Sequence, residues 1–183
     1  MLNDEALYTA VEKAFDAETI DAVTKASNES TIPVDNMGNK TLRPFEDGVL
    51  GQKVIDILQK NNIWNFDCQA LDSMIHFTFE NGSHISWRRS LRYGLPDMDV
   101  KLTYIVKLYE ASFEPHYPLK VFCFDTSLDE DRFKSPEECA GLYDLTMQVG
   151  DMVIIPAYTP WCIEPVQGRQ DYLIGDVLGR PWR

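Results

Sequence analysis

The stretch Gly150-Asp-Met-Val-Ile-Ile-Pro156-Ala-Tyr-Thr-Pro160-Trp161 is the most informative part of this chain of 183 residues. Its centre, Met152 to Ile155, holds four apolar residues in a row between a glycine and a proline. A short apolar run bounded by such turn-forming residues is typical of a buried β-strand. Five residues separate Gly150 from Pro156, and four separate Pro156 from Trp161. The stretch therefore predicts a strand followed by a turn, with Trp161 after the turn.

Upstream of this strand, the hydrophobic pattern from about Asn62 onward has a period of two. Ile75, Phe77 and Phe79 alternate with polar residues, and residues 101–108 repeat the pattern. Such alternation is typical of strands with one buried face. The predicted strands cover residues 75–79, 101–108, 119–124, 152–155 and 172–177.

The first sixty residues are predicted to be mainly helical. Residues 7–14 place their apolar side chains on one face of a first helix, and a second helix begins near Ile20. Residues 50–58 follow the spacing of an amphipathic helix. Between these helices, Asn36 and Gly38 have turn chemistry. We expect the helices to support a sheet.

An acidic insertion, residues 125–144, interrupts the predicted strands. Within it, Ser135 is suited to cap a helix, Pro136 to occupy its first turn and Glu138 to complete a capping box. A short helix in a loop is therefore predicted there.

Length and composition indicate one globular domain. A chain of this length lies within the usual domain range of roughly 50 to 250 residues, and 44% hydrophobic with 25% charged residues is ordinary for a soluble domain. Helices followed by antiparallel strands indicate an α+β architecture with a sheet sandwich or barrel. We expect residues 1–60 to form a mainly helical support and residues 61–183 to form the β-core around the insertion.

The chain is acidic, with a formal net charge of −12. Repulsion from phosphates argues against nucleic acid or an anionic membrane surface as a partner. The chain has no run of about 18 apolar residues, and its first residues lack the basic and apolar regions of a signal peptide. A cytoplasmic protein is expected.

Four segments, taken in order, carry a resemblance to a known family. The segments are Asn62 to Asp67, Phe79 to Trp87, Lys101 to Leu108 and Gly150 to Pro165. In their order and separation they resemble the 2-oxoglutarate and Fe(II)-dependent oxygenases, particularly the compact prolyl-hydroxylase-like type of bacteria and their viruses. The resemblance implies a double-stranded β-helix, a jelly-roll or cupin-like fold, with N-terminal supporting helices.

In that family, two histidines and one carboxylate bind Fe(II) and leave positions for co-substrate and oxygen. The resemblance assigns these three positions to Arg88, Ser90 and Trp161. Arginine has no lone pair to donate, a serine hydroxyl is neutral, and tryptophan offers only an N–H donor. The resemblance thus implies a protein that has lost its metal site and binds neither metal nor cofactor.

The former metal site carries two hypotheses. In the first, the Arg88 guanidinium stacks on Trp161 and fills the old cavity, with a contribution of ~1 to 2 kcal/mol if the pair is desolvated. In the second, Arg169, Arg88 and Tyr104 bind 2-oxoglutarate or another small anion. The family clamps its co-substrate with a basic residue on a late strand, near the position of Arg169.

The resemblance and the missing ligands together indicate a pseudoenzyme that acts as a binding or structural module, through a protein partner or self-association. A viral setting is expected, with the protein in the host cytoplasm or the virion. One alternative is an active hydroxylase with Fe(II) and 2-oxoglutarate as cofactors, its ligands drawn from His76, His84 and His116. The other alternative is a virion or assembly component.

Overall fold

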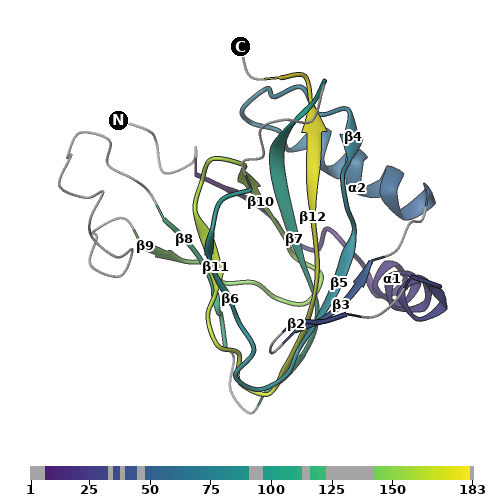
Figure 1. Cartoon of the computed structure of the whole chain (residues 1–183), viewed down its shortest axis with the longest axis vertical. Coiled ribbons are helices and arrows are strands. Elements are labelled where there is room, and N and C mark those ends of the chain that lie inside the picture. Colours follow the sequence, from purple (N-terminus) through teal and green to yellow (C-terminus); the bar gives the residue numbers. More distant parts are fainter. Residues whose placement is uncertain are drawn as a thin grey trace.

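Two antiparallel sheets face each other, and two helices lie beside the larger sheet on the side away from the smaller one (Figure 1). The helices are α1 (Ala17–Glu29) and α2 (Gly48–Lys60). This computed structural model describes residues 7–32, 35–37, 40–44, 48–90, 97–112, 116–122 and 142–181.

The larger sheet has eight strands in the order β1, β10, β7, β12, β5, β3, β2, with β4 paired to β12. Their bounds are Thr9–Val11 for β1, Asp35–Met37 for β2, Lys40–Pro44 for β3, Ala70–Leu71 for β4, Ile75–Phe79 for β5, Asp99–Ala111 for β7, Met152–Pro156 for β10 and Arg169–Gly179 for β12. The smaller sheet has the order β6 (Ile85–Arg88), β11 (Trp161–Ile163), β8 (Leu119–Phe122), β9 (Leu142–Asp144). The strands predicted from the alternating pattern are confirmed at residues 75–79, 101–108, 119–122, 152–155 and 172–177.

Both helices bury one face against the larger sheet. α1 begins at an N-cap, Asp16, whose carboxylate accepts a hydrogen bond from the Thr19 backbone N–H at 2.8 Å. In α2 the buried residues Leu50, Val54 and Leu58 recur every four positions, as the sequence predicts. No helix in the described ranges is long and apolar enough to cross a membrane.

The larger sheet has an apolar core on each face. Tyr104 and Val106 of β7 pack with the helices in what we call the helix-side core. Ile105, between them in sequence, packs with Trp161 of the smaller sheet in the inter-sheet core. The predicted strands had one buried face, but β7 is buried on both faces because a second layer covers each of them. Lys107 is thus fully buried.

Gly150, the first residue of the stretch that ends at Trp161, is required by the turn before β10. Its φ of +96° is in the region that favours glycine. A Cβ at this position would lie 2.5 Å from the Phe15 carbonyl oxygen. The turn is held by hydrogen bonds from Gly150 N to Lys107 O and from Phe15 N to Gly150 O. Gly150 therefore lets the turn before β10 lie close to β7 and to the segment that precedes α1.

Two predictions for the first sixty residues are wrong. Residues 9–11 form β1 and not a helix, because they pair with the edge of β10, with Thr9 opposite Ile154. Asn36 lies within β2, which pairs with β3, and not in a turn. Gly38 and most of the acidic insertion, including the helix predicted at Ser135, lie outside the described residues. The last three residues of the insertion form β9.

The double-stranded β-helix fold with supporting helices, of class α+β, is confirmed by this arrangement. Its two long central strands, β7 and β12, pair along their whole length. They carry inward-facing residues that, with those of the smaller sheet, form the candidate site.

Candidate functional site

The three positions that the resemblance assigns to metal ligands lie close together, with Trp161 and Ser90 buried and Arg88 exposed. β6 and β11 are antiparallel neighbours, and Arg88 is paired with Trp161 in their register. The Arg88 guanidinium carbon lies 5.7 Å from the Trp161 ring, a distance at which cation and ring attract each other. Trp161 is 2% exposed, whereas Arg88 is exposed. The indole ring thus lies in the interior, and the cation that contacts it stays in solvent.

Ser90 connects Trp161 to the larger sheet through consecutive hydrogen bonds. Trp161 Nε1 lies 3.4 Å from Ser90 Oγ, which is 2.5 Å from Thr103 Oγ1, which is 2.7 Å from Asp176 Oδ1. All four side chains are buried. An indole N–H can only donate, an ionised carboxylate can only accept, and each hydroxyl has one hydrogen. The bonds therefore run in one direction, from the indole through two hydroxyls to the carboxylate. We call these four residues the Trp161 chain.

Backbone hydrogen bonds position Ser90 and the segment that leads to Trp161. Ser90 N donates to Ala157 O at 3.1 Å, and Ala157 N donates to Lys101 O at 3.0 Å. The turn that links β10 to β11 is closed by a bond from Thr159 N to Pro156 O at 2.9 Å. The spacing of Pro156 and Trp161 in the sequence therefore corresponds to a turn that brings the indole opposite Ser90.

The residues at these positions do not fit Fe(II). Arg88 and Trp161 have no lone pair to offer, and Ser90 Oγ already takes part in two hydrogen bonds of the Trp161 chain. Among the four residues of the Trp161 chain, only Asp176 offers a ligand of the type that a facial triad uses, a carboxylate. Within the described parts of the chain, no group of three or more His, Cys, Asp or Glu residues is arranged to hold a metal ion.

The three histidines lie in separate surroundings. His76 is buried on the helix side of β5, where Nδ1 lies 3.0 Å from Ser27 Oγ of α1 and Nε2 lies 3.0 Å from Asp171 Oδ2. His116 Nε2 lies 3.2 Å from the Pro165 carbonyl oxygen. His84 is exposed just before β6. Of the three histidines, His76 links α1 to the larger sheet through its hydrogen bonds to Ser27 and Asp171.

Arg169 and Tyr104 are not brought to Arg88. The Arg169 guanidinium makes two hydrogen bonds of 3.0 Å to the Asp171 carboxylate, on the side of β12 that faces His76. Burial alone would raise the pKa of Asp171, but hydrogen bonds from His76 and Arg169 outweigh it and lower this pKa. The Tyr104 hydroxyl donates to the Ser73 carbonyl at 2.8 Å, and burial raises its pKa. Both candidate anion ligands thus lie on the opposite face of the sheet from Trp161.

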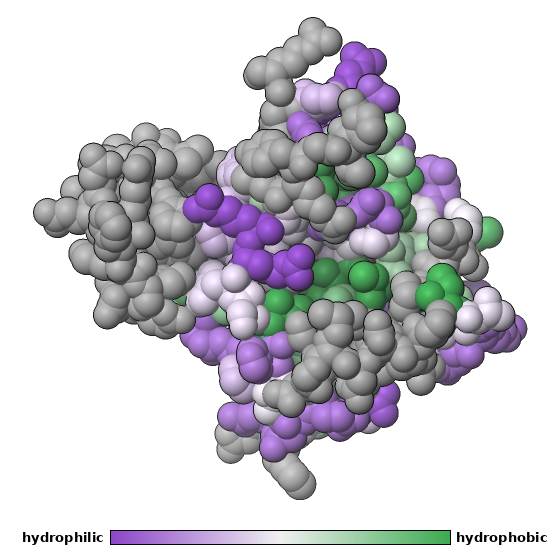
Figure 2. All heavy atoms as spheres, in the orientation of Figure 1, coloured by the Kyte–Doolittle hydropathy of each residue, from purple (hydrophilic) through white to green (hydrophobic). Residues whose placement is uncertain are grey.

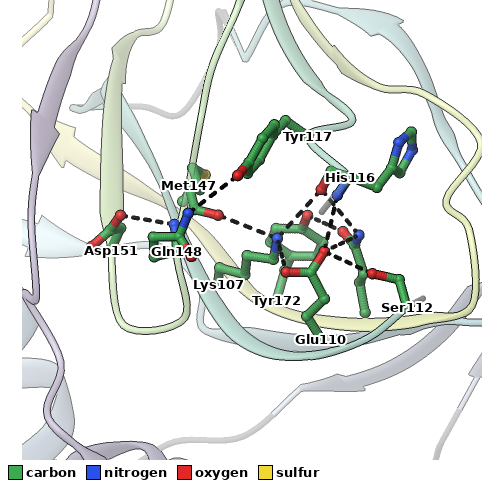
Figure 3. Close-up of polar contacts among 10 residues, drawn as sticks. Lys107, Glu110, Ser112, His116, Tyr117, Met147, Gln148, Asp151 and Tyr172 are labelled. Atoms are coloured by element: carbon green, nitrogen blue, oxygen red, sulfur yellow. Dashed lines mark hydrogen bonds and ion pairs between the residues drawn. The ribbon is translucent and has the colours of Figure 1, made fainter. Parts of the chain in front are cut away.

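A second buried polar group lies on the face of the larger sheet that meets the smaller one, and it was not predicted from the sequence. Lys107, Glu110, Gln170 and Tyr172 form the Lys107 cluster, in which hydrogen bonds and an ion pair join β7 to β12 and to residues 116 and 147 (Figure 3). The one signal for it in the sequence is the position of Lys107 in the period-two pattern. That pattern shows which residues share a face, but not that a second sheet covers the face.

Apolar side chains pack with Trp161 between the sheets. In Figure 2, hydrophobic residues gather at the middle of the face shown, bordered by hydrophilic ones. The inter-sheet core contains Phe77, Ile155 and Ile174, each less than a tenth exposed, together with Trp161. Trp161 is thus one member of an apolar core to which both sheets contribute.

Among known proteins, no family model and no curated sequence matches this chain. Solved structures do match, and they show that the chain has the fold of the 2-oxoglutarate/Fe(II) oxygenases. A prolyl-4-hydroxylase from Pseudomonas putida matches with a TM-score of 0.68 and 12% identity, covering 95% of this chain and 93% of that one. The resemblance noted in the sequence motifs is confirmed at the level of the fold.

Two further structures agree. The viral collagen prolyl hydroxylase of Paramecium bursaria Chlorella virus-1, in complex with 2-oxoglutarate, matches with a TM-score of 0.66 and 12% identity over 96% of this chain and 97% of that one. HygX from Streptomyces hygroscopicus, with nickel, 2-oxoglutarate and hygromycin B bound, matches with a TM-score of 0.66 and 11% identity over 98% and 87%. At such low identities the likeness concerns the fold and not the chemistry.

Proposed function

We propose that this protein is a non-catalytic protein with the fold of the 2-oxoglutarate/Fe(II) oxygenases, and that it works as a binding or structural module without metal. The observation that carries the proposal is the Trp161 chain. Where two histidines and a carboxylate would bind Fe(II), a buried indole donates to Ser90, whose hydroxyl is in turn bonded to Thr103.

Two physical arguments support this proposal. An indole is larger than an imidazole and has no lone pair, so Trp161 takes the space of a ligand without supplying one. Making room for a metal would also mean removing this ring from the inter-sheet core. Truncating a buried aromatic residue to alanine typically costs ~3 to 5 kcal/mol. Opening this site for a metal would therefore sacrifice the packing of the Trp161 ring.

The proposal extends to what the protein binds and where. We expect a protein partner or a second copy of the chain, because a net charge of −12 opposes contact with nucleic acid. A viral setting, with the protein in the host cytoplasm or as a component of the virion or its assembly, belongs to the same proposal. It is supported by analogy with the viral prolyl hydroxylase of similar fold.

A second candidate function is an active oxygenase with Fe(II) and 2-oxoglutarate. It is favoured by the fold, since HygX, which was solved with nickel and 2-oxoglutarate bound, has the same architecture. This function would need metal ligands other than Arg88, Ser90 and Trp161.

Calorimetric titration with Mn(II), as a stand-in for Fe(II), distinguishes the two functions. The chelator-treated protein is titrated with and without 2-oxoglutarate, and we expect no stoichiometric binding in either case. The matched variant is Arg88→His/Ser90→Asp/Trp161→His, which restores the ligand types of the facial triad. We expect this variant, once shown to be folded by circular dichroism, to gain Mn(II) binding. Stoichiometric binding by the unaltered protein, strengthened by 2-oxoglutarate, would overturn the proposal.

A further inference from the structure

β1 closes the edge of the larger sheet beside β10 (Figure 1). Its three residues pair antiparallel with β10, from Thr9 opposite Ile154 to Val11 opposite Met152. All five residues of β10 are buried, and without β1 this strand would present an open apolar edge. Such an edge pairs readily with another strand. The register thus shows which segment of the chain fits there.

A bend in the left-handed region connects β1 to the rest of the chain. Lys13, shortly after β1, has a φ of +49°, which residues with a Cβ adopt only at a cost. Its backbone N–H donates to Asp151 Oδ1 at 2.9 Å, and this bond fixes the bend. Glu12 and Lys13 are exposed, so the bend can straighten without taking either side chain out of the core. A short, strained connection of this kind favours exchange of the element that it carries.

Phe15 marks the point where the chain becomes fixed again. Its side chain is 2% exposed in the helix-side core, and its backbone N–H donates to Gly150 O at 2.9 Å. Asp16 follows as the N-cap of α1. Residues 12–14 therefore form a hinge, and opening this hinge moves β1 while α1 stays on the sheet.

We propose that two copies of the chain exchange β1, so that each β1 fills the β10 edge of the other copy. The pairs between β1 and β10 are the same within one copy and between two, so the exchange neither gains nor loses them. The two forms differ at the hinge, because Lys13 needs its left-handed bend only when β1 lies on its own copy. Straightening the hinge relieves this strain once in each copy of the dimer. The bond from Lys13 N to Asp151 is exposed, so water replaces it at little cost.

An exposed apolar side chain beside the hinge supports a second copy as the partner. Val149 is 44% exposed and precedes Gly150, whose carbonyl binds the Phe15 N–H. In the exchanged dimer both hinges run from one copy to the other, so this side chain lies where the copies meet. The dimer is the self-association expected under the proposed function, and its role as a module rests on that proposal. It uses no residue of the Trp161 chain.

Variants of Lys13 test the strain, with molar mass measured by light scattering after refolding at a series of protein concentrations. Lys13→Gly removes the strain and should raise the dissociation constant of the dimer at least about tenfold. Lys13→Val, whose branched side chain suits the left-handed region least, should lower this constant at least about tenfold. Lys13→Arg keeps a long cationic side chain and should leave it unchanged.

A disulfide between copies tests the exchange itself. Ala10 is opposite Val153 in the register, and cysteines at paired positions of antiparallel strands lie within disulfide range. Ala10→Cys and Val153→Cys, unfolded, mixed and refolded together, should give a covalent dimer that contains one of each. Neither variant refolded alone should form this dimer. Ala10→Cys/Val153→Cys, refolded at low concentration, should close the disulfide within one chain.

The proposal fails if the unaltered protein and Lys13→Val are monomers at every concentration. It also fails if Lys13→Gly and Lys13→Val dimerise equally well. A dimer whose mixed cysteine variants do not crosslink, although the double variant closes its disulfide, would place self-association on another surface. That result overturns the exchange of β1 and leaves the proposed function standing.

Discussion

The Trp161 chain and the Lys107 cluster both bury polar groups between the same two sheets, but they satisfy them differently. In the Trp161 chain, an indole and two hydroxyls, all neutral, form consecutive hydrogen bonds that end at a carboxylate. The Arg88 cation that contacts the indole ring is exposed. In the Lys107 cluster, a fully buried ammonium faces its carboxylate directly. A lost hydrogen bond between neutral groups costs ~1 kcal/mol, whereas an unpaired buried charge costs several times more. Stability should therefore depend more on the Lys107 cluster.

The largest effect is expected from removing the carboxylate of the buried pair. Glu110→Ala leaves the Lys107 charge unpaired and should lower the free energy of unfolding by ~3 to 5 kcal/mol. Lys107→Met should cost less, because methionine fills the space and the partly exposed carboxylate keeps its other donors. Urea denaturation of both variants measures the difference. Equal losses of unfolding free energy in the two variants would show that the unpaired Lys107 charge is not what destabilises Glu110→Ala.

A smaller effect is expected in the Trp161 chain. Trp161→Phe keeps an aromatic ring but removes the N–H that Ser90 accepts, and should cost ~1 to 2 kcal/mol. Because Ser90→Ala removes the other half of the same bond, the double variant should cost less than the sum of the two single losses, by ~0.5 to 1.5 kcal/mol. Additive losses in a double-mutant cycle would contradict the hydrogen bond.

On the helix side of the larger sheet, the lowered pKa of Asp171 makes the free energy of unfolding decrease in acid. The native pKa lies below the ordinary value of 3.8, so Asp171 contributes stability above about pH 4. That contribution should be lost as the pH falls through the native pKa. Asp171→Asn should remove this part of the acid dependence when unfolding is measured between about pH 2 and pH 6. Asp144→Asn, at a more exposed carboxylate paired with Lys120, should leave it in place.

The smallest effect is expected at Arg88. Its contact with the Trp161 ring is partly solvated because Arg88 is exposed, so Arg88→Ala should cost ~0.5 to 1 kcal/mol. Thermal unfolding of Arg88→Ala in the background of Trp161 and of Trp161→Phe measures the contact. A loss as large as that of Glu110→Ala would mean that the Arg88 cation, and not the Trp161 chain, contributes most of the stability at these positions.

Sequence patterns were most informative where local periodicity is enough. The amphipathic spacing of α2 and the alternation in β5 and β7 predicted real elements, because both periods are set by the backbone of a single segment. They failed at residues 9–11, whose short strand exists only because the edge of β10 is available to pair with it. An element that depends on a distant partner has no periodic signal of its own.

The sequence by itself determined the β-rich fold and the residue types at the three positions that the resemblance assigns to metal ligands, because strand period and motif spacing are properties of the chain. Only the tertiary structure decided what those residues do. Thr103 and Asp176 are 73 positions apart, and Trp161 and Ser90 are 71 apart, so no local pattern links them. Likewise, Lys107 is buried because a second sheet covers β7. A period of two shows which side chains share a face, and the packing of layers decides whether that face meets water.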